Sequence, residues 1–267
     1  MRSVKELMGL NGRVALVAGG GGHIGAALCH ALGELGASIA VLDMSEEAAA
    51  SVVAQIEDAY GAKAVQLVVD ISDTSKVRAI PDWLASRFGR LDILVNCAAL
   101  VGTSKLPGWS VPFLEQSPET FAAALEVNLA AAFLLTQTCV PALLRSTHGS
   151  VINIASIHGM VGPDMRLYEG TGLGNPAAYA ASKGGLLQLT RWLATVLAPT
   201  IRVNAVTPGG IWRGQPDVFR ERYVARTPLA RMGREEDLKG AVAYLASDLS
   251  AYVTGHNLVV DGGWIAW

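Results

Sequence analysis

The stretch VALVAGGGGHIG, residues 14–25, joins an apolar run to four consecutive glycines and the start of a helix-like segment. Gly19, Gly22 and Gly25 are three residues apart, and residues 26–37 continue with helical periodicity. Glycines at such a junction permit a tight turn, so that the backbone can approach a pyrophosphate at the N-terminus of the helix. The stretch predicts a phosphate-binding turn; the alternative is a glycine-rich turn without a ligand.

Seven short aliphatic or β-branched runs alternate with helical stretches along the chain. Their continuous apolarity is typical of strands covered on both faces, and the helices between them indicate right-handed crossovers in a parallel sheet. The sequence therefore predicts a single α/β domain over residues 1–267, a Rossmann-like doubly wound seven-stranded parallel sheet with helices on both faces. The runs cover residues 13–18, 38–43, 64–70, 91–96, 150–156, 201–207 and 257–263.

The composition excludes several classes of partner. The 267 residues are 51% hydrophobic and 16% charged with a net charge of −2, which gives no electrostatic footprint for a nucleic acid. Three cysteines without a CxxC pair predict reduced core thiols and no metal site. The first ten residues are too short and too charged for a signal peptide, and no apolar run reaches about 18 residues. We expect a cytoplasmic protein with no membrane partner.

Asp43 ends the second predicted strand, 24 residues after Gly19. A carboxylate there accepts hydrogen bonds from an adenosine ribose diol and repels a 2′-phosphate, which favours NAD over NADP. Residues 44–47 add two acids and no Lys or Arg. The alternative is that Asp43 caps a helix starting near Ser45.

Three polar side chains predict proton chemistry. Tyr179 and Lys183 are four residues apart on a predicted helix and project from one face. A phenol has a pKa of about 10, and a nearby ammonium and a positive nicotinamide ring would lower it, so Tyr179 is the candidate general acid and base. Ser156, at the end of a strand, would hold the substrate oxygen by a hydrogen bond.

These segments occur in the order typical of the short-chain dehydrogenase/reductase family, which the chain resembles over residues of about 10–264. The matching motifs are AGGGGHIG (18–25), NCAA (96–99), NIAS (153–156), YAASK (179–183) and PGGI (208–211). The resemblance implies catalytic Ser156, Tyr179 and Lys183, with Asn128, inside an apolar helix, holding a water in a proton relay. It also implies cofactor contacts from Gly19, Gly22, His23, Ile24, Gly25, Asp43, Asp70, Ile71, Asn96, Ala98, Tyr179, Lys183, Pro208, Gly209 and Ile211.

Several positions depart from the family pattern. Ala18 replaces the usual threonine and His23 the middle glycine, so the spacing GxxGxxG resembles the branch that acts on nucleotide sugars. Cys97 and Ala99 replace Asn and Gly. Arg213 stands where a threonine of the family often contacts the cofactor carboxamide, and the sequence does not decide whether Arg213 makes that contact.

Substrate loops are expected near residues 100–118, 158–178 and 209–230. The interval from Ser156 to Tyr179 is 23 residues against roughly a dozen in typical relatives, which predicts an insertion beside the substrate. This insertion and the terminal VDGGWIAW resemble a bacterial subgroup of flagellin-modification and nonulosonic-acid sugar pathways. The candidate substrate contacts are His158, Arg166, Tyr168 and Arg213, with the two arginines meeting a phosphate or carboxylate or simply solvated.

The sequence predicts an NAD-dependent oxidoreductase that interconverts a secondary alcohol and a ketone on a polar or sugar-like substrate. The alternatives are an epimerase or dehydratase that uses tightly bound NAD, and a non-enzymatic NAD-binding sensor. The family resemblance implies a homotetramer, or a dimer, built through helices near 118–146 and 176–198. Trp264 and Trp267 are expected to anchor a neighbouring subunit or to close the substrate pocket.

Overall fold

A single seven-stranded parallel sheet organises the chain. The computed structural model describes residues 1–102 and 104–267, and its strand order is β3-β2-β1-β4-β5-β6-β7. The predicted doubly wound α/β fold is confirmed; β2 matches its predicted run at both ends, and the other six strands lie at theirs with shorter or shifted ends. The strands are β1 (Val14–Ala18), β2 (Ser38–Asp43), β3 (Ala64–Val68), β4 (Ile93–Asn96), β5 (Ser150–Ile154), β6 (Arg202–Pro208) and β7 (Asn257–Val260).

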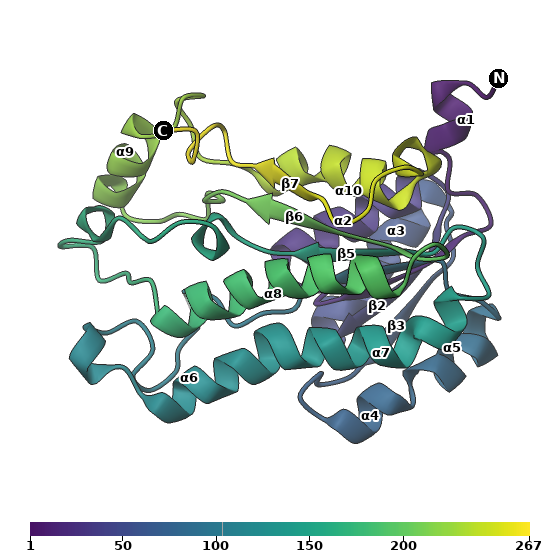
Figure 1. Cartoon of the computed structure of the whole chain (residues 1–267), viewed down its shortest axis with the longest axis horizontal. Helices are drawn as coiled ribbons and strands as arrows, with labels where there is room; N and C mark the ends of the chain where they lie inside the picture. Colours follow the sequence, from purple (N-terminus) through teal and green to yellow (C-terminus); the bar gives the residue numbers. More distant parts are fainter. Residues whose placement is uncertain (103) are drawn as a thin grey trace.

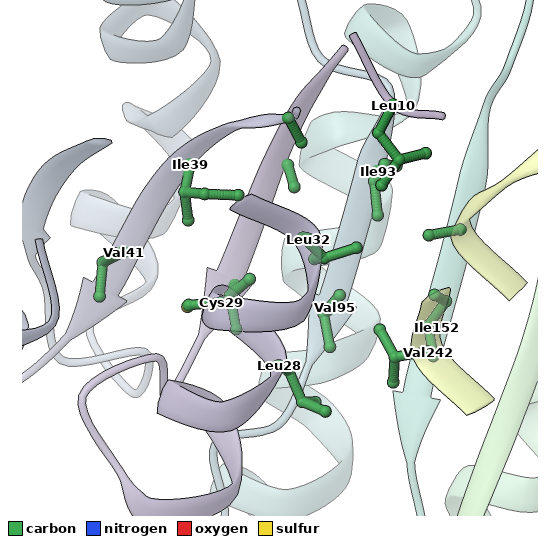
Figure 2. Packing of buried hydrophobic residues seen from close by; sticks show 14 of the residues in the cluster. Leu10, Leu28, Cys29, Leu32, Ile39, Val41, Ile93, Val95, Ile152 and Val242 are labelled. Carbon is green, nitrogen blue, oxygen red and sulfur yellow. The ribbon is translucent and has the colours of Figure 1, made fainter. Parts of the chain in front are cut away.

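Helices cover both faces of the sheet because successive strand residues point to opposite sides. Ala15 and Val17 of β1 face one apolar core, which Leu28 and Leu32 complete from the helix side (Figure 2). Leu16 faces the opposite core. Helices α2 (His23–Glu34), α3 (Glu46–Tyr60) and α10 (Lys239–Ala246) cover the first face; α4 (Thr74–Arg78), α5 (Ile80–Phe88), α7 (Ala131–Leu143) and α8 (Ala177–Val196) cover the second.

The second face carries the longest helical segment. Helix α6 (Pro118–Leu125) continues through a π-helical turn, η2 (Glu126–Ala130), into α7, and α6 runs beside α8 in Figure 1. In the part of the chain that is described, residues 118–143 form the one helix long and apolar enough to cross a membrane by length and composition. Buried α7 residues such as Leu135 and Cys139 face the sheet, as in the core helix of a globular protein.

The remaining helices lie at the ends of the sheet (Figure 1). Helix α1 (Val4–Met8) precedes the sheet, and α9 (Asp217–Ala225) follows β6 near the C-terminus. Short 3₁₀ turns interrupt the loops at η1 (Phe113–Glu115), η3 (Ile157–Gly159), η4 (Met165–Leu167), η5 (Glu235–Leu238) and η6 (Asp248–Ser250).

The strand order reverses between β1 and β4, and this point positions the site. Loops that follow β1 and β4 diverge to opposite faces there and leave a crevice at the carboxyl edge. Gly19 has φ +74° and approaches Ala98 so closely that a Cβ would lie 2.7 Å from the Ala98 backbone. A Cβ on Gly25 would collide with the carbonyl oxygen of Gly19. The two glycines therefore allow β1, the turn and α2 to close around the crevice.

Candidate active site

A cleft of about 770 Å³ runs along the carboxyl edge of the sheet. It is bordered by the loops after six of the strands, by the insertion at 158–178 and by α9. Among the residues predicted for cofactor, catalysis and substrate, it brings together Gly19, Gly22, His23, Ile24, Gly25, Asp43, Asp70, Ile71, Ala98, Ser156, His158, Tyr168, Tyr179, Lys183, Pro208, Gly209, Ile211 and Arg213. Asn96, Asn128 and Arg166 do not line the cleft.

The N-terminus of α2 opens into this cleft without a cap. Gly22 occupies the N-cap position, where it provides no side-chain hydrogen bond. Among the described residues, the backbone amides of His23, Ile24 and Gly25 have no hydrogen-bond partner. Free amides and the helix dipole together form an anion site, and the absent side chains of the preceding glycines leave room for a pyrophosphate. The turn therefore fits the phosphates of a dinucleotide.

Asp43 lies beside this turn. Its Oδ2 accepts a hydrogen bond from the Gly21 amide at 3.0 Å and its Oδ1 one from the Ser45 amide at 3.0 Å. Ser45, not Asp43, caps α3, because the Ser45 hydroxyl accepts from the Ala48 amide. The alternative of a helix-capping role is therefore wrong. The carboxylate is fixed toward the cleft and keeps lone pairs for a ligand hydroxyl.

The three catalytic candidates converge from two elements. Tyr179 and Lys183 project from the first two turns of α8, and Ser156 follows β5. Lys183 is 3% exposed; its Nζ donates to the Ile154 carbonyl at 2.7 Å and lies 6.0 Å from the Tyr179 ring centroid. The Ser156 hydroxyl lies near enough to the Tyr179 phenol to lower its pKa. A proton donor, a cation and a hydroxyl thus face one point in the cleft.

Burial shifts the pKa values of both ionisable groups. Loss of water lowers the pKa of Lys183 to about 8. It raises the pKa of Tyr179, against the hydrogen bond from Ser156 and the charge of Arg213, which lower it. The predicted lowering of the phenol pKa is therefore wrong for the residues of the chain by themselves, because desolvation outweighs the nearby charges.

Two predicted amides serve the scaffold behind the cleft. Asn128, in the π-helical turn, accepts from the Leu100 amide at 2.7 Å and donates to the Leu100 carbonyl and to the Ser182 hydroxyl. Asn96 donates to the side chains of Thr136 and Asn153 inside the sheet. The side chain of Asn128 thus holds the loop after β4, and that of Asn96 is too deep to touch a ligand in the cleft.

The substrate end of the cleft has an aromatic wall. His158, Trp264, Tyr223, Phe219 and Tyr168 follow one another with ring centroids 5.4–6.2 Å apart. All except Trp264 line the cleft. Trp264 is 1% exposed behind the wall, in contact with residues of its own chain, so the prediction that it anchors a neighbouring subunit is wrong.

The two arginines predicted to contact the substrate lie in different environments. Arg213 lines the cleft, where Glu235 pairs with its guanidinium at 3.1 Å and its charge lowers the pKa of Tyr179. Arg166 is exposed at the surface and forms an ion pair with Asp164 at 2.8 Å. A substrate role for Arg166 therefore finds no support in the geometry.

Sequence reasoning missed several residues at the substrate end of the cleft. Phe219 and Tyr223, four residues apart on α9, share one helix face, and that spacing is the signal by which they could have been found. Asn175 was missed because it lies in the irregular insertion; its Nδ2 donates to the Tyr168 hydroxyl at 3.2 Å. Nothing in the local sequence indicates Met232, which reaches the cleft from a distant loop.

Comparisons with known proteins agree with this geometry. The family model described as enoyl-(acyl carrier protein) reductase matches residues 20–265. The 3-oxoacyl-(acyl-carrier-protein) reductase FabG of Thermotoga maritima is 32% identical, over 96% of this chain and 99% of its own. The chain belongs to the short-chain dehydrogenase/reductase family. It is therefore a member of an oxidoreductase family whose nicotinamide cofactor the cleft described above can hold.

Other members of the family have different partners and substrates by name. The cis-4-hydroxycyclohexanecarboxylate dehydrogenase of Sinomonas cyclohexanicum is 34% identical, over 95% of this chain and 97% of its own. The post-translational flagellin modification protein A of Campylobacter coli is 30% identical, over 96% and 99%. Its identity is no higher than those of the other two relatives, so the narrower resemblance to the flagellin-modification subgroup is not singled out.

Solved structures of the family bind both nicotinamide cofactors. A gluconate 5-dehydrogenase of Burkholderia cenocepacia in complex with NADP and tartrate superimposes with a TM-score of 0.87 at 31% identity, over 99% of this chain and 100% of its own. An NAD⁺-bound xylitol dehydrogenase superimposes with a TM-score of 0.83 at 31% identity, over 95% and 99%. These likenesses support a nicotinamide cofactor for the family fold without distinguishing NAD from NADP.

Proposed function

We propose that this short-chain dehydrogenase/reductase uses NAD to interconvert a secondary alcohol and a ketone on a polar or sugar-like substrate. The observation that carries the proposal is the convergence of Tyr179, Lys183 and Ser156 in the same cleft as the uncapped N-terminus of α2. One end of the cleft fits the phosphates of a cofactor, and the other end carries the groups for proton transfer. A non-enzymatic sensor requires only the first of these features.

The residues of the chain divide the proton chemistry among themselves. A bound nicotinamide supplies the site that accepts or returns the hydride. Ser156 holds the substrate oxygen, and the Tyr179 oxygen removes the hydroxyl proton during oxidation or returns it during reduction. The Lys183 ammonium, held by the Ile154 carbonyl, favours the ionised phenol while it stays protonated, below its pKa of about 8.

Asp43 supports NAD rather than NADP as the cofactor. Its carboxylate is held by the Gly21 and Ser45 amides at the carboxyl end of β2, where the adenosine ribose of a cofactor on the α2 N-terminus would lie. Met44, the next residue along the chain, also lines the cleft and carries no charge for a 2′-phosphate. A carboxylate repels that phosphate and accepts hydrogen bonds from the free diol.

The substrate end of the cleft supports a polar substrate with an apolar face. His158, Tyr168, Asn175 and Arg213 provide polar atoms, and the aromatic wall provides a flat apolar surface, as in many sugar sites. The solved relatives named for gluconate and xylitol act on polyhydroxylated compounds, which agrees with this composition. We propose a small polyhydroxylated or hydroxy-acid substrate.

The experiment follows the absorbance of reduced nicotinamide over a panel of polyols, sugar phosphates and simple secondary alcohols, with NAD and NADP in parallel. We expect oxidation with NAD that falls roughly 10²–10⁴-fold in Tyr179→Phe, because the phenol carries the proton. Asp43→Ser should raise the relative use of NADP. Tightly bound NAD without net NADH formation would instead favour the epimerase or dehydratase, and unchanged biological activity of Tyr179→Phe would favour the sensor.

We also propose that the protein forms a homo-oligomer through the α6–α7 and α8 helices. Four large apolar side chains on these helices are exposed in the single chain: Phe121 at 37%, Phe133 at 39%, Trp192 at 54% and Val196 at 50%. Exposed aromatic residues on neighbouring helices are typical of an interface between copies. The helices also match the family's usual assembly surface.

A further inference from the structure

Two buried ring nitrogens at the substrate end of the cleft have no hydrogen-bond partner among the described residues. They are Nδ1 of His158 and Nε1 of Trp264. The two rings meet edge to face, with centroids 6.2 Å apart and planes at 77°. An unpaired buried polar atom costs about 1–3 kcal/mol, so two of them in adjacent rings call for a common explanation.

The two nitrogens have complementary hydrogen-bonding roles. The indole Nε1 is a donor only, whereas the imidazole Nδ1 accepts when the ring proton is on Nε2. Burial lowers the pKa of His158 to about 4, so the ring is neutral and one of its nitrogens is free to accept. We propose that Trp264 donates to His158 Nδ1 and so holds His158 as the tautomer whose Nε2–H faces the substrate.

The surroundings fix Trp264 for this role. Its ring stacks on Tyr223 with centroids 5.7 Å apart and planes at 18°, and the Arg226 guanidinium lies 4.5 Å over it. The indole is 1% exposed, so its N–H has no access to bulk water. Trp264 contacts neither substrate nor cofactor, because it does not line the cleft. It is therefore a positioning residue that acts through His158.

His158 is placed to donate a hydrogen bond to a substrate oxygen next to the reacting one. Its backbone amide donates to the Ser156 hydroxyl at 3.2 Å, so the two side chains belong to one turn, η3. His158 lines the cleft, and Nε2 is not among its buried unpaired atoms. With Ser156 on the reacting oxygen, a donor from His158 matches an oxygen on the adjacent carbon. The inference rests on the proposed function and narrows its substrate to vicinal diols and α-hydroxy ketones.

The first test reads the tautomer and needs no activity. Nitrogen NMR of the imidazole side chains distinguishes a protonated Nδ1 from a protonated Nε2, and His158→Gln identifies the signal. We expect the Nε2–H form in the wild-type protein and a mixture of tautomers in Trp264→Phe, which keeps the aromatic packing and loses the N–H. A wild-type His158 protonated on Nδ1 would overturn the proposal.

The second test compares kcat/KM for 1,2-cyclohexanediol and cyclohexanol, two substrates that differ by one hydroxyl. We expect wild type to prefer the diol by roughly tenfold, the worth of one well-placed hydrogen bond. Trp264→Phe should lose most of that preference while its kcat/KM for cyclohexanol is unchanged. In His158→Gln the glutamine amide donates a hydrogen bond whatever Trp264 does, because an amide has no tautomers to select. The preference for the diol should therefore survive in His158→Gln, and adding Trp264→Phe should not reduce it.

The outcomes separate the two proposals. Equal losses for diol and cyclohexanol in Trp264→Phe would show a structural role only and overturn the inference. A loss of the diol preference when Trp264→Phe is added to His158→Gln would also overturn it. Oxidation of cyclohexanol without any wild-type preference for the diol would reject this substrate class and leave the proposed function standing. If no secondary alcohol gives a signal that depends on Tyr179, the proposed function and the inference both fail.

Discussion

Lys183 keeps an ammonium group in the interior, 3% exposed, with the Ile154 carbonyl as its protein acceptor. Burial of the charge lowers its pKa to about 8 from 10.5, which is a cost to the folded state at neutral pH. Lys183→Met removes the charge and keeps the length of the side chain. We expect it to abolish oxidation and to raise the free energy of unfolding at pH 7, on the order of 2 kcal/mol after the lost hydrogen bond. Urea denaturation measures the change.

The pH dependence of that gain has a definite sign. Between pH 8 and 10.5 the native Lys183 has released its proton while the unfolded chain still binds one, so wild-type stability rises with pH across this window. The advantage of Lys183→Met should therefore be largest at pH 7 and shrink by pH 10. Lys76→Met, at an exposed lysine, is the control and should show no such trend. An advantage that stays constant between the two pH values would contradict the desolvation argument.

Asp92 is a buried carboxylate at the opposite edge of the sheet, where its environment stabilises the charge. It is 0% exposed, takes two hydrogen bonds from Arg90, and accepts from the Ser146 hydroxyl and the Val14 amide. We expect Asp92→Ala to lower the free energy of unfolding by about 2–4 kcal/mol, because the buried Val14 amide and Ser146 hydroxyl lose their acceptor. Activity at low temperature should persist, since Asp92 is remote from the cleft. Asp58→Ala, at an exposed carboxylate, is the control in the same denaturation experiment.

Acid should weaken the wild-type protein through the same group. The Arg90 guanidinium and the Ser146 hydroxyl hold the pKa of Asp92 below its usual range, against burial. The stabilisation is therefore present above the unfolded pKa of about 3.9 and is lost as the pH falls through the folded value. Asp92→Ala should show a flatter decline in stability below pH 4 than wild type. Parallel declines would contradict this assignment.

At the scale of elements, local pattern predicts the strands and fails in the insertion. The strands at 38–43 and 202–208 could be predicted because they are buried on both faces, so every residue of each run is apolar or internally bonded. The insertion follows no such pattern. Its path depends on Arg222, which donates to the carbonyls of Arg166 and Glu169 from α9, 53 or more residues away. Such long-range contacts leave no periodic signal in the segment itself.

Asp164 ties this insertion to α9 and predicts a change in substrate binding. Its carboxylate pairs with Arg166, in the insertion, and with Arg226, immediately after α9. Asp164→Asn removes the negative charge that pairs with both arginines. The insertion and the aromatic wall should then no longer be held at a fixed distance from each other. We expect KM to rise roughly 3–10-fold with little change in kcat, because Tyr179 is untouched. Steady-state kinetics on the best substrate of the panel measures both constants.

The matched control for Asp164 is an ion pair within α9. Asp217→Asn breaks the ion pair with Arg220 within α9 and leaves the insertion in place, so its KM should stay at the wild-type value. The Arg166 guanidinium holds the pKa of Asp164 well below its usual range. The carboxylate stays ionised above about pH 4, and the KM ratio of variant to wild type should be constant from pH 5 to pH 9. A fall in kcat with unchanged KM would contradict a role in substrate spacing.

At the scale of the whole molecule, one edge of the sheet has a structural role and the other forms the site. The amino edge holds the ion pairs of Asp92 and Asp248, which are structural, and the carboxyl edge holds the cleft. Most motif residues of the cleft could be predicted because they follow a predicted strand, and Tyr179 and Lys183 because their spacing puts them on one face of α8. Asn96 and Asn128 were predicted for the site by the same family resemblance, yet their side chains form hydrogen bonds with other residues of the fold. A motif gives the neighbourhood of a residue, whereas the direction of its side chain depends on which backbone groups lack partners.

The oligomer proposed above would assemble through the outer face of α7 and α8. Phe133 and Trp192 are 39% and 54% exposed there, and burying two aromatic side chains from each copy contributes several kcal/mol to association. We expect the wild type to sediment as a dimer or tetramer and Phe133→Glu with Trp192→Glu to sediment as a single chain, since four carboxylates would then face one another. Tyr252→Glu, at a fully exposed aromatic outside these helices, should leave the mass unchanged. Circular dichroism separates dissociation from unfolding, and a folded variant that keeps the wild-type mass would move the interface elsewhere.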